Sequence, residues 1–205
     1  MEEPYRIVAH GNNMGRRHLA LGFLRAFYRF AAEEQLSRDI HETSAAQRRA
    51  HMALFEALNW LTSFQDFMHL GPAGRKADPA WIEALNNDQA KAISGLSYAR
   101  NLIHHRWWEI LALDMLMTEN GQVNTWIWSG LPGGGRGSKH ALRSDYEDAL
   151  LGQPAIKAMT LVRDALWEWR GNEISEEDLH QPTYPLPHDA WPEATKRAAR
   201  LASLS

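Results

Sequence analysis

The chain has 205 residues, of which 44 % are hydrophobic and 23 % charged; it contains no cysteine and carries a formal net charge of −3. These proportions are those of a globular protein, and the lack of cysteine excludes disulfide scaffolds, thiolate zinc sites and cysteine nucleophiles. The N-terminus has no apolar signal core, and no stretch reaches the ~18 uninterrupted apolar residues of a membrane helix. We therefore expect a cytoplasmic protein with no membrane association.

The charge is unevenly distributed along the chain. Residues 1–144 hold 16 Lys+Arg and 14 Asp+Glu, whereas residues 145–205 hold 6 and 11. The negative balance argues against a protein that coats nucleic acid nonspecifically, and the acidic third is expected to turn away from an anionic substrate. We predict one helical domain over residues 1–171 and, over residues 172–205, an acidic, proline-containing extension that ends in a short helix near 191–201.

In the first part of the chain, residues 6–10 favour a short strand and residues 11–13 a turn that leads into a helix from about Met14 to Leu36. A second helix is predicted from Thr43 or Ser44 to Leu70, and Asp78-Pro79 predicts a short helix to Leu85. The two long helices have apolar positions at helical spacing: Leu19, Phe23, Phe27 and Phe30 in the first, and Leu54, Leu58, Leu61 and Met68 in the second.

In the second part, Asp88 is the predicted cap of a helix of about 25 residues that reaches Leu113. Residues 121–128 lose the helical period and favour a strand or hairpin, and residues 154–169 predict a last helix. The glycine-rich segment 131–138 has neither the Walker spacing nor the spaced-glycine dinucleotide pattern. The expected fold class is therefore all-α, a helical bundle with a short β-hairpin near residues 121–129.

The long third helix has an apolar face that includes a single arginine. A helical wheel collects Ile93, Leu96, Ala99, Ile103, Trp107, Ile110 and Leu111 on this face. Arg100 falls inside the same stripe, where a guanidinium has a large desolvation cost unless it is paired. One interpretation is a structural ion pair with Asp114, which lies in the same stripe. The other is an anionic ligand bound at a cleft.

A second face of this helix is small, hydrogen-bonding and aromatic. It comprises Ser94, Ser97, Tyr98, Asn101, His105, Trp108 and Ala112. Such a face suits another helix or a partner subunit. His104 lies ~40° from Arg100 around the helix and His105 lies ~140° away. If Arg100 and His105 act together, their site must form between subunits or at a bend, and we therefore expect a homodimer.

The segment Arg100-Asn101-Leu102-Ile103-His104-His105 resembles the signature of HEPN domains, in which an arginine is followed, after four to six residues, by a histidine, with a polar first intervening residue. The resemblance covers mainly this helix and the helical layout. It implies a helical bundle in which two copies face one cleft, and a metal-independent RNA endonuclease that acts as a toxin, antiphage effector or RNA-processing enzyme. A toxin would also have an antitoxin partner.

The resemblance also implies roles for the residues of the motif. An imidazole, with a pKa near ~6.5, can take the proton of a ribose 2′-hydroxyl or give one to the leaving oxygen, and His105 is the candidate, with His104 as the alternative. Arg100 would hold the scissile phosphate, and Asn101 would orient His105 or the phosphate. Arg106, Trp108 and Tyr98 are the expected substrate contacts, Trp108 by stacking on a base or, alternatively, at a dimer contact.

A wider basic path and a metal site are the remaining hypotheses. Residues that could line an RNA path are Arg16, Arg17, Arg48, Arg49, Arg106, Arg136 and Lys139, although solvated helix faces explain most of them. Neighbouring histidines diverge by ~100° on a helix and do not chelate one ion easily, and Asp66 with His69 has the spacing of a di-iron motif without a second copy. We expect no metal and no cofactor. The alternative function is a noncatalytic helical module that only dimerises or binds a partner.

Overall fold

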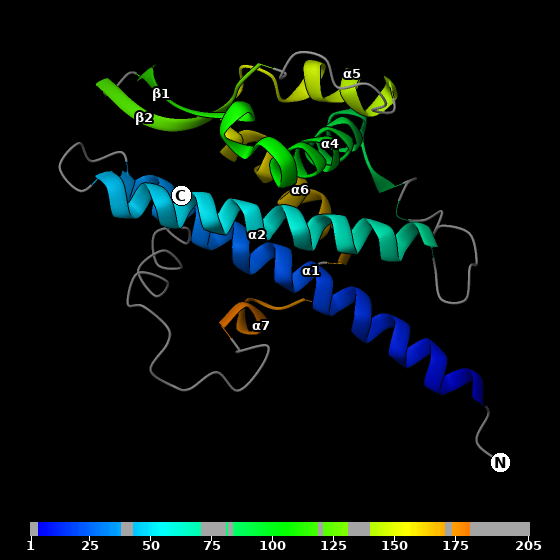
Figure 1. Cartoon of the computed structure of the whole chain (residues 1–205). Helices are drawn as coiled ribbons and strands as arrows, with labels where there is room; N and C mark the ends of the chain where they lie inside the picture. The colour runs from blue at the N-terminus through cyan, green and yellow to red at the C-terminus, as the bar shows by residue number, and fades with distance from the viewer. Residues whose placement is uncertain are drawn as a thin grey trace.

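The computed structural model describes residues 4–37, 43–70, 81, 84–118, 121–130, 140–170 and 174–180. Its elements are α1 (Pro4–Ser37), α2 (Thr43–Leu70), α4 (Asn87–Ile110), β1 (Leu111–Thr118), β2 (Gly121–Trp128), α5 (His140–Ala149), α6 (Ala155–Arg170) and α7 (Glu176–His180). Helices α1 and α2 run antiparallel; α4, α5 and the hairpin lie on one side of this pair, α6 passes behind it, and α7 lies on the other side (Figure 1). The all-α class with a short hairpin is confirmed.

Several predictions fall on residues that are not described. The glycine-rich segment 131–138 and the terminal helix near 191–201 lie outside the described residues, as does most of the short helix predicted after Pro79, of which Trp81 and Ala84 are described as helical. Among the helices of the described ranges, none is both long enough and apolar enough to cross a membrane.

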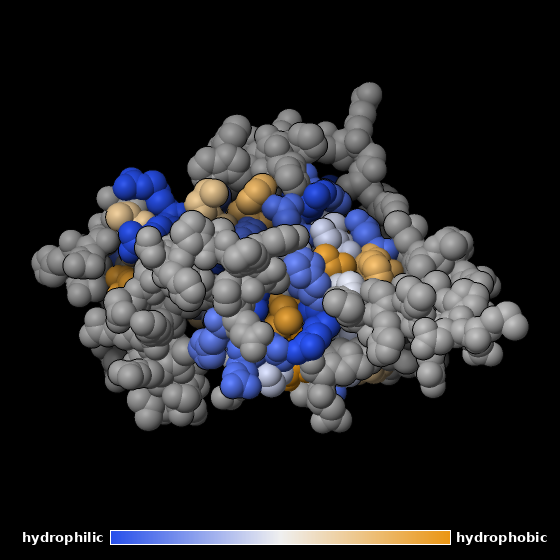
Figure 2. All heavy atoms as spheres, turned by 90° about the horizontal axis from the view of Figure 1, so that it is seen from below, coloured by the Kyte–Doolittle hydropathy of each residue, from blue (hydrophilic) through white to orange (hydrophobic). Residues whose placement is uncertain are grey.

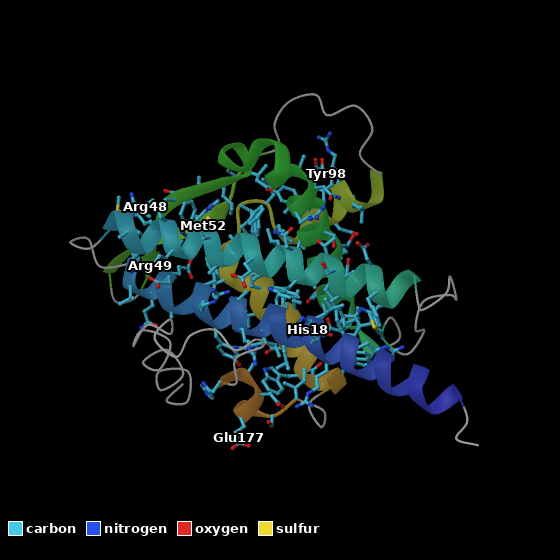
Figure 3. The ribbon with its side chains drawn as sticks, turned by 60° about the horizontal axis from the view of Figure 1, so that its bottom comes forward. His18, Arg48, Arg49, Met52, Tyr98 and Glu177 are labelled. Atoms are coloured by element: carbon cyan, nitrogen blue, oxygen red, sulfur yellow. The ribbon has the colours of Figure 1, made fainter. Side chains whose placement is uncertain are left out.

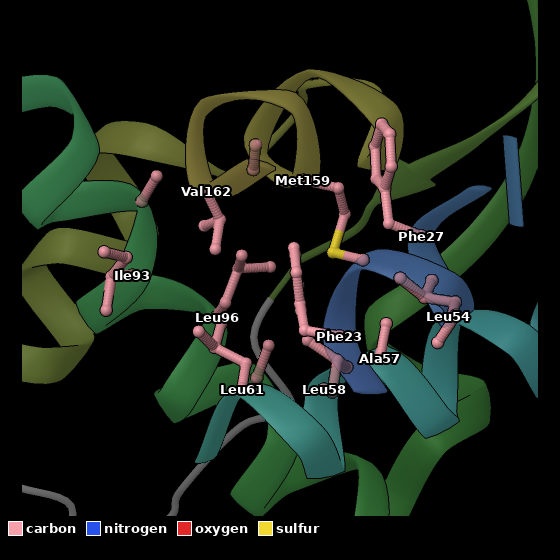
Figure 4. Packing of buried hydrophobic residues seen from close by; sticks show 14 of the residues in the cluster. Phe23, Phe27, Leu54, Ala57, Leu58, Leu61, Ile93, Leu96, Met159 and Val162 are labelled. Atoms are coloured by element: carbon pink, nitrogen blue, oxygen red, sulfur yellow. The ribbon is translucent and has the colours of Figure 1, made fainter. Parts of the chain in front are cut away.

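The core lies where α1, α2, α4 and α6 meet (Figure 4). The predicted apolar positions of the two long helices are buried, except Leu19, which is half-buried. Helix α6 adds Met159, Val162 and Leu166, and α4 adds Ile93 and Leu96. Helical periodicity thus located the core correctly, because each of these helices buries one stripe against the others.

The N-terminal strand predicted over residues 6–10 is wrong. Helix α1 begins at Pro4 and continues through residues 11–13, where a turn was expected. Proline is favoured in the first turn of a helix, since its missing N–H has no intrahelical partner there, and an isolated glycine is tolerated inside a helix. A five-residue strand would also have needed a partner strand to pair with.

Both ends of α4 differ from the prediction. The N-cap is Asn86, two residues before the expected Asp88: Gln89 N donates to Asn86 Oδ1 at 2.9 Å, and Asn86 N donates to Gln89 Oε1 at 3.0 Å. This reciprocal capping box satisfies two backbone donors, while Asp88 lies in the first turn, where its charge favours the helix dipole. At the other end, α4 stops at Ile110 and the chain turns into β1.

Strands β1 and β2 form an antiparallel pair whose register runs from Leu111 opposite Trp128 to Thr118 opposite Gly121. The strand over 121–128 was predicted, but its partner was not, since Leu, Ala and Met favour a helix by intrinsic propensity. Pairing with β2 overrides that preference. The other edge of β2 is also used, because Gly152 N donates to Trp128 O at 2.8 Å from a turn in which Gly152 has a φ of 74°.

A buried carboxylate joins the hairpin to α1. Glu34 is 1 % exposed, and its Oε1 accepts hydrogen bonds from Thr125 Oγ1 at 2.5 Å and from Trp126 N at 3.3 Å. From α2, the ring of His51 lies 5.7 Å from that of Trp126. Burial lowers the pKa of His51, so this imidazole is neutral at physiological pH. The hairpin is therefore fixed to both long helices.

Helix α5, which the sequence did not predict, packs closely on α4. A side-chain Cβ at Gly95 would lie 2.7 Å from Leu150 Cδ1, 3.2 Å from Tyr146 Cα and 3.3 Å from Asp145 O, so a larger residue would force Leu150 and the α5 backbone to shift. The ring centroids of Tyr98 and Tyr146 are 5.6 Å apart, and Tyr146 donates to Ser129 O at 2.8 Å. Burial raises the pKa of Tyr146 above its usual range.

The start of the C-terminal extension belongs to the fold. Ile174 is buried, Arg17 forms an ion pair with Asp178 Oδ1, and Arg25 donates to the Asp178 carbonyl oxygen. Helix α7 is thereby held on α1, so the predicted boundary at residue 171 does not separate residues 174–180 from the domain. Figure 2 views the molecule from this side; where its surface is coloured, single hydrophobic side chains lie among hydrophilic ones.

We expect Asp178→Asn to loosen α7 without unfolding the domain. The hydrogen bond from Arg17 holds the pKa of Asp178 well below its usual range. The ionised carboxylate therefore contributes fully to the free energy of unfolding above the unfolded-state pKa of about 3.9, and this contribution is lost as the pH falls below that value. After solvent screening it amounts to ~1 kcal/mol or less. Amide exchange of residues 176–180 should rise several-fold at neutral pH in the variant, and in the wild type only at acid pH.

The matched control is Glu177→Gln, which removes one negative charge from the same helix at an exposed position. It should leave amide exchange unchanged. Equal exchange in both variants would show that the Arg17 contact does not hold α7.

Candidate functional site

Arg100 is held by two neutral amides. It is half-buried on α4, where its Nε donates to Asn59 Oδ1 of α2 at 3.3 Å and its Nη1 donates to Asn101 Oδ1 at 3.3 Å. Asn59 Nδ2 donates to the Phe55 carbonyl oxygen at 3.0 Å, which turns the amide oxygen of Asn59 toward the guanidinium. Neither acceptor carries a charge, so the positive charge of Arg100 is not neutralised by them.

A second polar contact fixes α4 on α2 beside this arginine. Ser97 Oγ donates to Gln65 Oε1 at 2.6 Å. Along α4 the contacts run from Ser97 to Arg100, and along α2 from Gln65 back to Asn59, so the two helices run antiparallel here. The position of Arg100 is thus set by the crossing of the two helices.

The predicted ion pair between Arg100 and Asp114 is wrong. Asp114 is exposed on β1, its Oδ1 accepts a hydrogen bond from Met115 N at 2.7 Å, and no hydrogen bond or ion pair joins it to Arg100, both being described residues. The wheel that placed both residues in one stripe assumed a helix to Leu113. Because α4 ends at Ile110, the helical spacing no longer applies beyond it.

Part of the predicted partner-binding face is used inside the chain. Ser94 Oγ donates to Asp145 Oδ2 at 2.5 Å, and Tyr98 is buried against Tyr146, so α5 covers this part of α4. Its burial removes Tyr98, whose place is marked in Figure 3, from the side chains that a substrate can contact. Asn101 remains exposed.

The other motif residues are placed by the backbone alone. His104, His105, Arg106 and Trp108 belong to α4, and the side chains of residues 103–109 lie outside the described residues. Position 104 is one turn from position 100 on the same side of the helix, and position 105 is ~140° away from it. The helical context of the motif is therefore confirmed.

The basic residues predicted to line an RNA path differ in their surroundings: some are paired with carboxylates and others are not. Arg17 pairs with Asp178, and Arg49 Nε lies 2.8 Å from Glu33 Oε1, so carboxylates neutralise both. Arg48 is exposed and forms no hydrogen bond or ion pair with the described part of the chain. Arg106, Arg136 and Lys139 have side chains outside the described residues, and Arg16 is half-buried.

Asn59 is the site residue that sequence reasoning missed. It lies 41 residues from Arg100 in a helix where apolar residues dominate, and a single asparagine there gives no functional signal. Its contact with Arg100 depends on the crossing of α2 and α4, which no local pattern reports. Among the described residues, no group of three or more His, Asp or Glu side chains could hold a metal ion.

Comparisons with known proteins identify no relative of this chain. No protein-family model matches the chain, no curated protein is similar to it, and no solved structure matches its fold. The residues around Arg100 are therefore the basis for assigning a function to this chain.

Proposed function

We propose that the protein is a metal-independent RNA endonuclease of the HEPN kind that binds the scissile phosphate at Arg100. One observation carries the proposal: the guanidinium of Arg100 is half-buried and, among the residues that the structure describes, is held only by the amide oxygens of Asn59 and Asn101. A partly desolvated cation without a counter-charge favours an anionic ligand, and a guanidinium matches phosphate by its fork of donors. Asn101 then acts by orienting Arg100.

The chemistry follows from the side chains of the motif. His105, or His104 on the same side of α4 as Arg100, takes the proton from a ribose 2′-hydroxyl, and the 2′-oxygen attacks the adjacent phosphorus. The bond from phosphorus to the 5′-oxygen breaks, and that oxygen receives a proton. The products are a 2′,3′-cyclic phosphate and a 5′-hydroxyl. Arg100 stabilises the negative charge that develops on the phosphate oxygens.

In this proposal two copies of the chain face one cleft, as in the family that the motif resembles. The support is exposed surface on α4 and on the strand that follows it: Asn101 is exposed beside Arg100, and on β1 the residues Leu113 and Met115 are 37 % and 56 % exposed. Apolar side chains on an open strand edge suit contact with another chain. A toxin or antiphage effector, with an antitoxin in the first case, is the corresponding biological role.

We expect the purified protein to cut RNA in the presence of EDTA. The proposed reaction uses imidazole and guanidinium groups and needs the 2′-hydroxyl as nucleophile, so an oligonucleotide with one 2′-deoxy nucleotide should resist cleavage at that position only. Gel analysis of end-labelled RNA measures both results. Cleavage that EDTA abolishes and a divalent ion restores would contradict the proposal, as would equal cutting at the 2′-deoxy position.

A further inference from the structure

One face of α2 continues the Arg100 site along the molecular surface. Its residues recur at spacings of three or four and therefore lie in one line along the helix. We call this line the α2 stripe; it consists of Arg48, Met52, Phe55, Asn59 and Ser63. Arg48 and Ser63 are exposed, Met52 is 63 % exposed, and Phe55 and Asn59 are half-buried. Arg100 reaches the stripe at Asn59.

The charges beside the stripe distinguish Arg48 and Arg100 from the other charged side chains. On the flanks of α2, Glu56 pairs with Arg29 and Arg49 pairs with Glu33, so these four charges are balanced. Arg48 has no carboxylate partner within the described ranges, and Arg100 has only amide partners. Two guanidinium groups without a described counter-charge therefore lie along one line, Arg48 at its start and Arg100 at Asn59.

The distance between Arg48 and Asn59, where Arg100 meets the stripe, fits a short length of nucleic acid. Asn59 lies eleven positions after Arg48 on the helix, which corresponds to ~16 Å at a rise of ~1.5 Å per residue. A few nucleotides of an extended single strand cover this length. Between Arg48 and Asn59, Met52 presents an apolar side chain on the same side of α2 as Arg48 (Figure 3). An unpaired base can pack on such a side chain, whereas the bases of a duplex are stacked and paired.

We infer that the α2 stripe binds single-stranded RNA, with Arg48 on a phosphate a few nucleotides away from the one at Arg100 and Met52 against an intervening base. The inference rests on the proposed function, because it extends the same site. It adds the substrate class, a single strand, and it assigns Arg48 and Met52 to substrate binding. A net charge of −3 and two contacting cations also mean that binding depends only modestly on salt.

Binding of a fluorescein-labelled, 2′-O-methylated RNA 12-mer tests this inference without cleavage, since the nucleophile is blocked. With two phosphates contacted, the logarithm of the association constant should fall against the logarithm of salt concentration with a slope of about −1.4. Arg48→Ala should weaken binding about tenfold and make the slope shallower by about 0.7. Met52→Glu should weaken it further, and the duplex of the same sequence should bind more weakly than the single strand.

The matched control is Arg143→Ala, which removes an exposed arginine from α5 that is paired with Glu147. It should leave affinity and slope unchanged. Equal losses in Arg48→Ala and Arg143→Ala, or tighter binding of the duplex, would overturn the inference. Sedimentation of the same variants supplies a further arm: if Met52→Glu dissociates a dimer and leaves RNA affinity unchanged, the stripe is a protein interface and the inference is wrong.

The failure of this inference is distinguishable from failure of the proposed function. If the methylated RNA binds through the α2 stripe but unmodified RNA is not cleaved, the proposed nuclease function is wrong and the inference that the stripe binds RNA stands. If the protein cleaves RNA but Arg48→Ala and Met52→Glu do not change its RNA affinity, the nuclease function stands and the inference that the stripe binds RNA is wrong.

Discussion

Arg100→Ala should reduce RNA cleavage at least a hundredfold while changing the free energy of unfolding by only ~1 kcal/mol. The reason is the chemistry of its partners: the variant loses hydrogen bonds to Asn59 and Asn101 but leaves no carboxylate without its cation. Removing one member of a buried ion pair would instead cost ~3–5 kcal/mol. Initial rates of cleavage and urea denaturation of the same preparations measure the two quantities.

A structural arginine would give the opposite pattern. Large destabilisation by Arg100→Ala, together with a wild type that cuts no RNA, would favour the noncatalytic interaction module. Arg143→Ala again serves as the control, because the charge of this α5 arginine is already balanced by Glu147, and the change should alter neither quantity.

The two histidines are separated by the same assay. Resemblance to the family spacing nominates His105 as the acid or base, whereas helix geometry puts position 104 nearer Arg100. We expect His105→Ala to abolish cleavage with little change in melting temperature. If His104→Ala abolishes cleavage and His105→Ala does not, the residue assignment is wrong although the reaction class stands.

Periodicity predicted the parts of the fold that bury a long stripe. Helices α1, α2 and α6 repeat apolar residues over several turns, and such a stripe identifies both the helix and its core face. Helix α5 was not predicted, because it has only ten residues, most of them polar, and its contact with α4 depends on Gly95. Strand β1 was not predicted, because its pairing with β2 overrides the helical preference of its residues.

The site was predictable only where it is local in sequence. The motif from Arg100 to His105 and its helical context were found from the sequence alone. The acceptor Asn59 and the coverage of Tyr98 by α5 are products of tertiary packing, so no spacing within the motif could indicate them. The assignment of Asp114 as the partner of Arg100 was also wrong. It required a helix that reaches Leu113, whereas α4 ends at Ile110.

The other large effect concerns stability. Phe64→Ala should lower the free energy of unfolding by ~3–5 kcal/mol, because a buried phenylalanine leaves a cavity that its neighbours only partly fill. Phe64 is fully buried, and its ring centroid lies 5.2 Å from that of Trp81 and 5.8 Å from that of Trp169, both edge-on. The two tryptophans are themselves 5.0 Å apart. This aromatic cluster joins α2 and α6 to residue 81.

Thermal unfolding followed by circular dichroism should show the melting temperature of Phe64→Ala about 10 °C below that of the wild type, since ~1 kcal/mol corresponds to ~2–4 °C in a domain of this size. Phe67→Ala is the matched control: it makes the same change one turn further along α2, at a half-buried position. Its loss should be smaller, because part of the Phe67 ring already contacts water and a less complete cavity remains. Equal losses in the two variants would mean that the cluster of Phe64, Trp81 and Trp169 does not stabilise the fold beyond an ordinary helix contact.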